Sequence, residues 1–324
     1  MSNTFEERAF EIFKNHCSNE EDNDYASNLI KALIDIISES KEQTMQGLTR
    51  NIKQSAEYIV EKSQTSGFLG SRTNLFLKST ASIFQHYINK GLQYYGGDNM
   101  EELKQNLKKV GKELLDIASQ SKDKIRINAL EFLQNGITIL IFGHSTVVAD
   151  SLIFGANKGI KFSCIVCETR PKCEGYLMYK KLTNHNIPCK FICDSALGTA
   201  VEEADLVLVG AEAVVENGGI INRIGTYTAA LCAKSLKKQF YVLAESFKFA
   251  RMFPLSQKDL PDSVKNSQDF DVVGDTFGLK KENINVLNPV CDYTPPNLIT
   301  LLFTDVGIFT PSAVSDELIQ IFNN

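Results

Sequence analysis

The residues Gly143, His144 and Ser145 directly follow a strongly apolar run and stand where a strand would give way to a helix. A serine two residues after a glycine in such a turn is one half of the nucleophile elbow of α/β hydrolases. The elbow also needs a second glycine two residues after the serine, where Val147 stands, and a later histidine, for which only His185 is available. We therefore interpret Ser145 as the cap of a helix whose backbone N–H groups face a pocket, with the hydrolase as the alternative.

Charged and polar residues also follow the other apolar runs that we expect to be strands. Arg170, Arg223 and Lys248 could bind a phosphate, because cations form charge-assisted hydrogen bonds with phosphate oxygens. Asp194 and Glu212 could accept hydrogen bonds from sugar hydroxyls. Taken singly, each charge could equally form a salt bridge or a helix cap. Together they indicate a binding site for a sugar phosphate, lined by Gly143, Ser145, Arg170, Asp194, Ser195, Glu212, Asn222, Arg223 and Lys248.

No residue is assigned a catalytic or metal-binding role, and no cofactor is expected. The turn after the first apolar run has no G-x-G-x-x-G sequence, so it lacks the glycines that let backbone approach a dinucleotide pyrophosphate. Cys164 and Cys167 have C-x-x-C spacing, but strand positions three apart point to opposite faces and cannot easily share one ion. We expect the eight cysteines to be small buried thiols in a reducing compartment.

The residues of this site lie in the second part of the chain, where continuous apolar runs alternate with helical patterns. Runs this apolar are typical of parallel strands that are covered on both faces. The expected strands are residues 137–142, 162–167, 190–193, 206–209, 240–244 and 298–303, and the expected helices are 123–134, 146–158, 172–185, 196–203, 224–237 and 312–322. The alternation predicts a Rossmann-like, doubly wound parallel sheet domain over residues 123–324, with a ligand site beyond the carboxyl ends of its strands.

The first part of the chain, residues 1–122, is expected to form an all-α helical domain. Apolar residues recur there every three or four positions, as in Leu29, Leu33 and Ile37, which is the spacing of one helix face. A later helix carries a row of lysines that we expect to be solvated, with a partner surface as the alternative. These lysines are Lys104, Lys108, Lys109 and Lys112.

The composition argues against two classes of partner. With 34 basic and 39 acidic residues the chain carries a net charge of −5, so binding of nucleic acid is not expected. No apolar run approaches the roughly 18 residues that span a membrane, and the first residues do not resemble a leader. We expect a cytosolic (cytoplasmic) protein whose partners are proteins or small molecules.

Two segments in the second part of the chain are distinctive. Residues 210–226 read GAEAVVENGGIINRIGT, and residues 242–249 read VLAESFKF. Together with the tail at 298–305 and 310–319, they closely resemble the alpha-subunit family of eukaryotic translation initiation factor 2B. That family belongs to a wider one that also contains isomerases of ribose 1,5-bisphosphate and of methylthioribose 1-phosphate.

The resemblance implies a regulatory alpha subunit of the complex that exchanges guanine nucleotide on initiation factor 2. It further implies a homodimer formed through the α/β domain, and association with the beta, gamma, delta and epsilon subunits of initiation factor 2B. The resemblance also implies that the assembled subunits sense the phosphorylated alpha subunit of initiation factor 2. The tail helix at 312–322 is apolar at Leu318, Ile319, Ile321 and Phe322, which agrees with a dimer surface. A sugar-phosphate isomerase or a sugar-phosphate-sensing protein is the alternative.

The sequence departs from the isomerase pattern at two positions. The resemblance places the isomerases' proton-transferring cysteine at Gly143 and their aspartate at Glu212. A glycine has no side chain to carry a proton, and a glutamate places its carboxylate about one methylene further out than general acid–base catalysis requires. We therefore expect a non-catalytic protein that keeps the phosphate-binding surroundings.

Overall fold

The computed structural model describes residues 5–18, 24–68, 74–95, 99–265 and 288–323. The chain divides into two compact units. The domain boundary proposed between residues 122 and 123 stays a prediction. One unit comprises Met1–Ser121, Phe247–Ala250 and Ile319–Asn324, and the other comprises Lys122–Ser246 and Arg251–Leu318.

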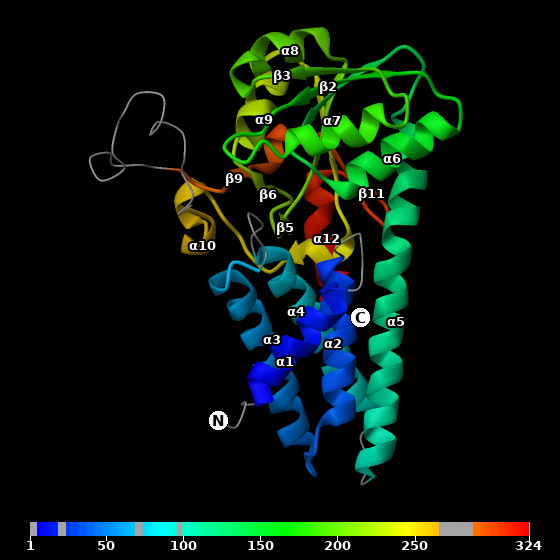
Figure 1. Ribbon diagram of the computed structural model, residues 1–324, viewed down its shortest axis with the longest axis vertical. Coiled ribbons are helices and arrows are strands. Elements are labelled where there is room, and N and C mark those ends of the chain that lie inside the picture. Colours follow the sequence, from blue (N-terminus) through cyan, green and yellow to red (C-terminus); the bar gives the residue numbers. More distant parts are fainter. Residues whose placement is uncertain (1–4, 19–23, 69–73, 96–98, 266–287, 324) are drawn as a thin grey trace, which may run out of the picture. The chain divides into compact units, whose positions relative to one another are not determined.

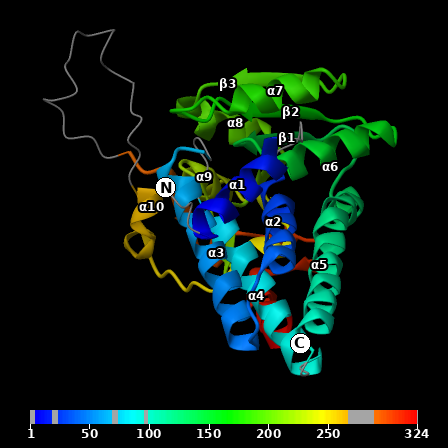
Figure 2. The same cartoon turned by 60° about the horizontal axis from the view of Figure 1, so that its bottom comes forward.

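The helical unit is built from helices that the apolar periodicity predicts (Figures 1 and 2). They are α1 (Phe5–Ser18), α2 (Tyr25–Glu39), α3 (Met45–Thr65), α4 (Leu75–Tyr95) and α5 (Met100–Asn128). Helix α1 packs on α2 and α3, and α4 packs on the same two helices. Side chains cap three of the helices, because Asp24, Thr44 and Asn99 accept hydrogen bonds from backbone N–H groups in the first turns of α2, α3 and α5.

The apolar stripes of these helices form the core of the helical unit. Leu29, Leu33 and Ile37 on α2 are fully buried, as are Leu48 and Ile52 on α3. Helix α5 differs from the sequence-based expectation, because it continues to Asn128 and is followed by a short 3-10 turn at Ala129–Glu131. The separate helix expected at 123–134 is therefore wrong: no glycine or proline interrupts the pattern at residue 122.

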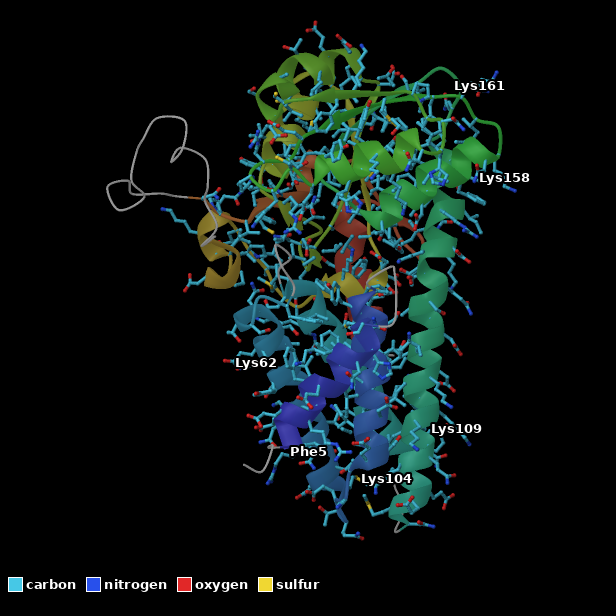
Figure 3. All side chains as sticks on the ribbon, viewed as in Figure 1. Phe5, Lys62, Lys104, Lys109, Lys158 and Lys161 are labelled. Carbon is cyan, nitrogen blue, oxygen red and sulfur yellow. The ribbon has the colours of Figure 1, made fainter. Side chains whose placement is uncertain are left out.

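Lys104 on α5 is buried, so the expectation that the whole row of lysines is solvated is wrong. Its side chain is only 10% exposed. Its Nζ donates a hydrogen bond of 2.8 Å to the backbone carbonyl oxygen of Ser40, the residue that ends α2. Lys109 and Lys112 are exposed, and Figure 3 shows Lys109 on the outer side of α5. Lys104 therefore satisfies a carbonyl that the end of α2 leaves without an intrahelical partner.

Replacing Lys104 with alanine is expected to lower the free energy of unfolding by about 1–3 kcal/mol. The substitution removes a charged donor and leaves the Ser40 carbonyl without its partner. Urea denaturation followed by circular dichroism measures the loss, and Lys109→Ala serves as the exposed control, expected within about 0.5 kcal/mol of wild type. Equal stabilities for the two variants would show that the contact does not stabilise the fold.

The α/β unit contains a seven-stranded sheet with the strand order β11-β10-β7-β4-β1-β2-β3. The six strands other than β11 pair in parallel, and β11 pairs antiparallel with β10. The strands are β1 (Thr138–Phe142), β2 (Ser163–Cys167), β3 (Cys189–Ile192), β4 (Leu206–Gly210), β7 (Gln239–Leu243), β10 (Leu301–Phe303) and β11 (Ile308–Phe309). The predicted fold class, a helical region followed by a doubly wound α/β region, is confirmed.

Helices cover both faces of this sheet (Figure 1). They are α6 (Thr146–Asn157), α7 (Gly175–Thr183), α8 (Leu197–Glu203) and α9 (Thr226–Ser235). From β1 the chain adds β2 and then β3 on one side, and it then crosses back to add β4 and β7 on the other side of β1. Because crossovers between parallel strands are right-handed, α6 and α7 lie on one face of the sheet and α8 and α9 lie on the other. Buried residues of β1, β2 and β4 form the core with the apolar side of α6.

A smaller antiparallel sheet was not predicted. It pairs β5 (Ala213–Val215) with β6 (Ile220–Arg223), and β6 with β9 (Cys291–Thr294). The remaining elements are β8 (Phe249–Ala250), α10 (Asp262–Lys265) and α12 (Pro311–Asn323). The tail side chains that the dimer prediction names, from Leu318 onward, lie outside the described side chains. Within the part of the chain that the structure describes, no helix is both long enough and apolar enough to cross a membrane.

Candidate functional site

The candidate site lies at the carboxyl ends of the parallel strands, where doubly wound sheets bind ligands. Ser145 caps α6 at this edge: its Oγ accepts a hydrogen bond of 3.5 Å from the backbone N–H of Val148. A Cβ built on Gly210 would approach the Cβ and Oγ of Ser145 to 2.6 Å, so Ser145 packs closely against the end of β4. The interpretation of Ser145 as a helix cap is confirmed.

The structure places the histidine of the hydrolase alternative away from Ser145. His185 follows the C-terminal end of α7, whereas the N-terminal end of α7 lies at the site. Its Nδ1 lies 2.9 Å from the carbonyl oxygen of Lys181, with which it forms a hydrogen bond. Ser145 and His185 therefore do not form the nucleophile–base pair that an elbow needs.

Hydrogen bonds link the ends of β1, β2 and β3. Thr169 Oγ1 accepts a hydrogen bond of 3.1 Å from the N–H of Gly143. Asp194, after β3, accepts bonds of 2.9 Å from the Thr169 N–H and 2.6 Å from the Arg170 N–H, one at each carboxylate oxygen. Thr169 has a positive φ of 59°, a backbone conformation that these bonds stabilise. Asp194 thus shapes the turn after β2, in addition to any contact with a ligand.

Arg223, at the end of β6, forms the most buried charge cluster of the site. Its Nε lies 3.0 Å from Oε2 of Glu174, and its Nη2 lies 3.6 Å from Oε1 of Glu212. The three side chains are only 10%, 17% and 15% exposed. Burial acts to lower the pKa of Arg223, but Glu212 and Glu174 outweigh it and raise that pKa. Arg223 is therefore a permanent cation shared between two carboxylates.

Asn222 and Asp292 fix the start of α9 beside Arg223. Asn222 Nδ2 donates a bond of 3.1 Å to Thr226 Oγ1, which itself donates to the carbonyl oxygen of Arg223. Asp292 on β9 accepts bonds from the N–H groups of Gly225 at 2.7 Å and Tyr227 at 3.1 Å. It therefore satisfies N–H groups that the first turn of α9 leaves open. Asn222 is buried and holds the backbone of the site.

The pKa of Asp292 predicts a pH dependence of stability. Burial raises this pKa from its ordinary value to about 7, although the hydrogen bonds from Tyr227 and Gly225 act to lower it. The folded chain therefore keeps a proton that the unfolded chain releases at lower pH. The stability that this proton contributes is complete below pH 4 and is lost as the pH rises to about 7.

Replacing Asp292 with asparagine is expected to flatten the pH dependence of stability between about pH 4 and 7, because an amide does not titrate there. Urea denaturation at several pH values measures the free energy of unfolding of both proteins. Burial also raises the pKa of Asp305, so the difference between wild type and variant isolates Asp292. Parallel pH profiles for the two proteins would contradict this assignment.

Three further site residues named from the sequence are Arg170, Ser195 and Lys248. Arg170 is 60% exposed and its Nε lies 3.2 Å from Oε2 of Glu168. Ser195 is exposed and lies in a 3-10 turn at Asp194–Ala196; α8 begins only at Leu197, after a cap residue, Ala196, that has no side-chain bond. The helix expected at 196–203 therefore begins one residue later than predicted, and Ser195 does not cap it. Lys248 belongs to the helical unit.

Sequence reasoning missed three residues that form the site. Thr169, Glu174 and Asp292 are 26, 49 and 67 residues from the partners Gly143, Arg223 and Gly225. Only for Thr169 did the sequence carry a signal, because it stands in a strand-exit segment.

Cys291, opposite Arg223 in the smaller sheet, is buried, and burial raises its pKa so that the thiol stays protonated. Within the described residues, no group of three His, Cys, Asp or Glu side chains is placed to hold a metal ion.

The fold and the site together define the class of protein. The chain belongs to the initiation factor 2 subunit family, whose model matches residues 19–311. It is 39% identical over 297 residues to the translation initiation factor eIF2B subunit alpha of Dictyostelium discoideum, covering 90% of each chain. The same subunit of Caenorhabditis elegans is 27% identical over 98% of this chain and 99% of its own length. The family resemblance inferred from the sequence is confirmed.

Isomerases and solved structures of the family are also similar. Ribose 1,5-bisphosphate isomerase of Thermococcus kodakarensis is 27% identical over 87% of this chain and 84% of its own length. The tetrameric eIF2B-beta2-delta2 complex from C. thermophilum contains a chain that superimposes with a TM-score of 0.74, at 18% identity, over 98% of this chain and 94% of that one. The structural likeness supports the fold, and the sequence identity favours the alpha subunits over the more distant isomerases.

Proposed function

We propose that the chain is the regulatory alpha subunit of a cytosolic complex that exchanges guanine nucleotide on translation initiation factor 2. The observation that carries the proposal is the 39% identity to an eIF2B alpha subunit over 90% of both chains. The subunit acts with beta, gamma, delta and epsilon subunits, and it takes part in sensing the phosphorylated alpha subunit of initiation factor 2. Exchange chemistry belongs to other subunits in this proposal.

The site supports a regulatory rather than a catalytic role. Gly143, where the isomerases would carry cysteine, has a φ of 85°, a conformation that disfavours any other residue. Glu212, where they would carry aspartate, is held near Arg223. Gly143 thus offers no side chain for proton transfer, and the Glu212 carboxylate is paired with Arg223.

Affinity purification from the organism's own cells tests the proposed assembly. A tagged full-length chain is expected to recover the beta, gamma, delta and epsilon subunits in constant proportion, as mass spectrometry would show. Recovery of the chain without them would contradict the assembly.

Sedimentation of the purified chain tests the proposed homodimer: we expect twice the chain mass of 36.1 kDa, and a species of single mass at micromolar concentration would overturn it.

We also propose that the carboxyl-edge site binds a phosphorylated sugar. Support comes from the buried Arg223, the exposed Arg170 and the N-terminus of α6, which starts after Ser145. Titration calorimetry with pentose and hexose phosphates is expected to give dissociation constants below 1 mM at this site. Arg170→Ala is expected to weaken binding, because it removes a charged hydrogen-bond donor. Absence of binding would overturn this part of the proposal.

A further inference from the structure

The contact between Arg223 and Glu174 has the geometry with which arginine binds a phosphate. The guanidinium meets the carboxylate at two points, with Nε 3.0 Å from Oε2 and Nη2 3.4 Å from Oε1. Arginine binds carboxylates and phosphates through this same two-point fork. The anion-binding edge of Arg223 is therefore occupied by a carboxylate of the chain itself.

The charges around Arg223 oppose a second anion. Glu212 lies 3.6 Å from the same guanidinium, so one positive charge faces two negative charges in a largely buried setting. A phosphate ester carries about 1.5–2 negative charges at pH 7. It would therefore meet repulsion from Glu174 and Glu212 that little solvent screens.

Glu174 is the carboxylate that occupies the two-point position on Arg223. It is the residue before α7, but its side chain makes no capping hydrogen bond, so its rotation does not expose the helix N-terminus further. Glu212 directly precedes β5, and its N–H donates a hydrogen bond of 2.9 Å to the Ile221 carbonyl oxygen. A Cβ built on Gly143 would lie 3.9 Å from Cγ of Arg223 and within 4 Å of no other described atom beyond its chain neighbours. A carbon added at Gly143 would therefore touch the arginine side chain without a clash.

We infer that Glu174 is an internal competitor for Arg223, which a phosphate monoester must displace, and that it thereby sets the affinity and selectivity of the site. The inference rests on the proposed sugar-phosphate site and adds its regulation. Removal of the Glu174 charge leaves Arg223 paired with Glu212, so the fold is retained while the two-point position becomes available. Neutral sugars do not need this position.

Calorimetric titration of the full-length chain with ribose 5-phosphate, inorganic phosphate and ribose tests the inference. Glu174→Gln is expected to bind ribose 5-phosphate at least tenfold more tightly than wild type, with no change for ribose. Glu203→Gln is the matched control, because it removes the same charge at an exposed residue that pairs with Lys190; it should match wild type. Glu174→Asp, which shortens the side chain and keeps its charge, should bind at least threefold more tightly than wild type.

The outcomes separate the inference from the proposed function. If wild type binds ribose 5-phosphate and Glu174→Gln binds it equally or more weakly, Glu174 is not a competitor and the site itself stands. If neither protein binds, the sugar-phosphate site is wrong and the inference falls with it. Thermal melting confirms that each variant is folded, and should Glu174→Gln fail to fold, the comparison with Glu174→Asp decides.

Discussion

Replacing Arg223 with alanine is expected to lower the free energy of unfolding of the α/β unit by about 3–5 kcal/mol. The substitution leaves Glu174 and Glu212 largely buried without the cation that neutralises them, and breaking a buried pair from one side costs about this much. Urea denaturation of full-length protein measures the change. Arg170→Ala, at an exposed arginine with its own carboxylate partner, is the control and should keep the stability of wild type.

A triple variant shows whether uncompensated charge causes the loss. Arg223→Met combined with Glu174→Gln and Glu212→Gln removes the charges together and keeps much of the side-chain volume. Neutral replacements of buried ion pairs are often tolerated, so this variant is expected to regain at least half of the lost stability. A loss below about 1 kcal/mol in Arg223→Ala, or no recovery in the triple variant, would show that the cluster does not act as a charge-balanced unit.

The purified chain is expected to show no isomerisation of ribose 1,5-bisphosphate or methylthioribose 1-phosphate. General acid–base catalysis by a positioned side chain contributes about 10²–10⁴ in rate, and Gly143 provides none at the end of β1. An assay of product formation over several hours measures the activity, with the related Thermococcus kodakarensis isomerase as positive control. Turnover that Glu212→Gln abolishes would contradict the assignment and restore the enzymatic alternative.

Most parallel strands of the large sheet were predictable because they are continuous apolar runs between helical patterns, whereas β3 includes the exposed Lys190. Thr138–Phe142 and Leu206–Gly210 begin and end within one residue of their expected bounds. The smaller sheet was not predictable in this way, since Ala213–Val215 and Ile220–Arg223 are only three and four residues long. Runs this short carry too little period-two alternation to identify a strand.

The site was located from the sequence, but its pairings were not. The strand-exit rule brought together Gly143, Ser145 and Glu212, because carboxyl ends of parallel strands share one edge of the sheet. It could not show that Glu174, 49 residues before Arg223, is the main partner of that arginine. Lys104 was misjudged for the same reason: its partner, the carbonyl of Ser40, is 64 residues away. Contacts at such separations depend on tertiary packing, which local periodicity does not contain.

The rate of guanine-nucleotide exchange on initiation factor 2 tests the regulatory role most directly. Exchange complexes would be reconstituted with and without this chain, and each assayed for GDP release in the presence of the phosphorylated alpha subunit of initiation factor 2. We predict that the phosphorylated factor inhibits exchange by the complex that contains the chain and inhibits the complex without it far less. Equal inhibition of both complexes would contradict the regulatory role proposed for this protein.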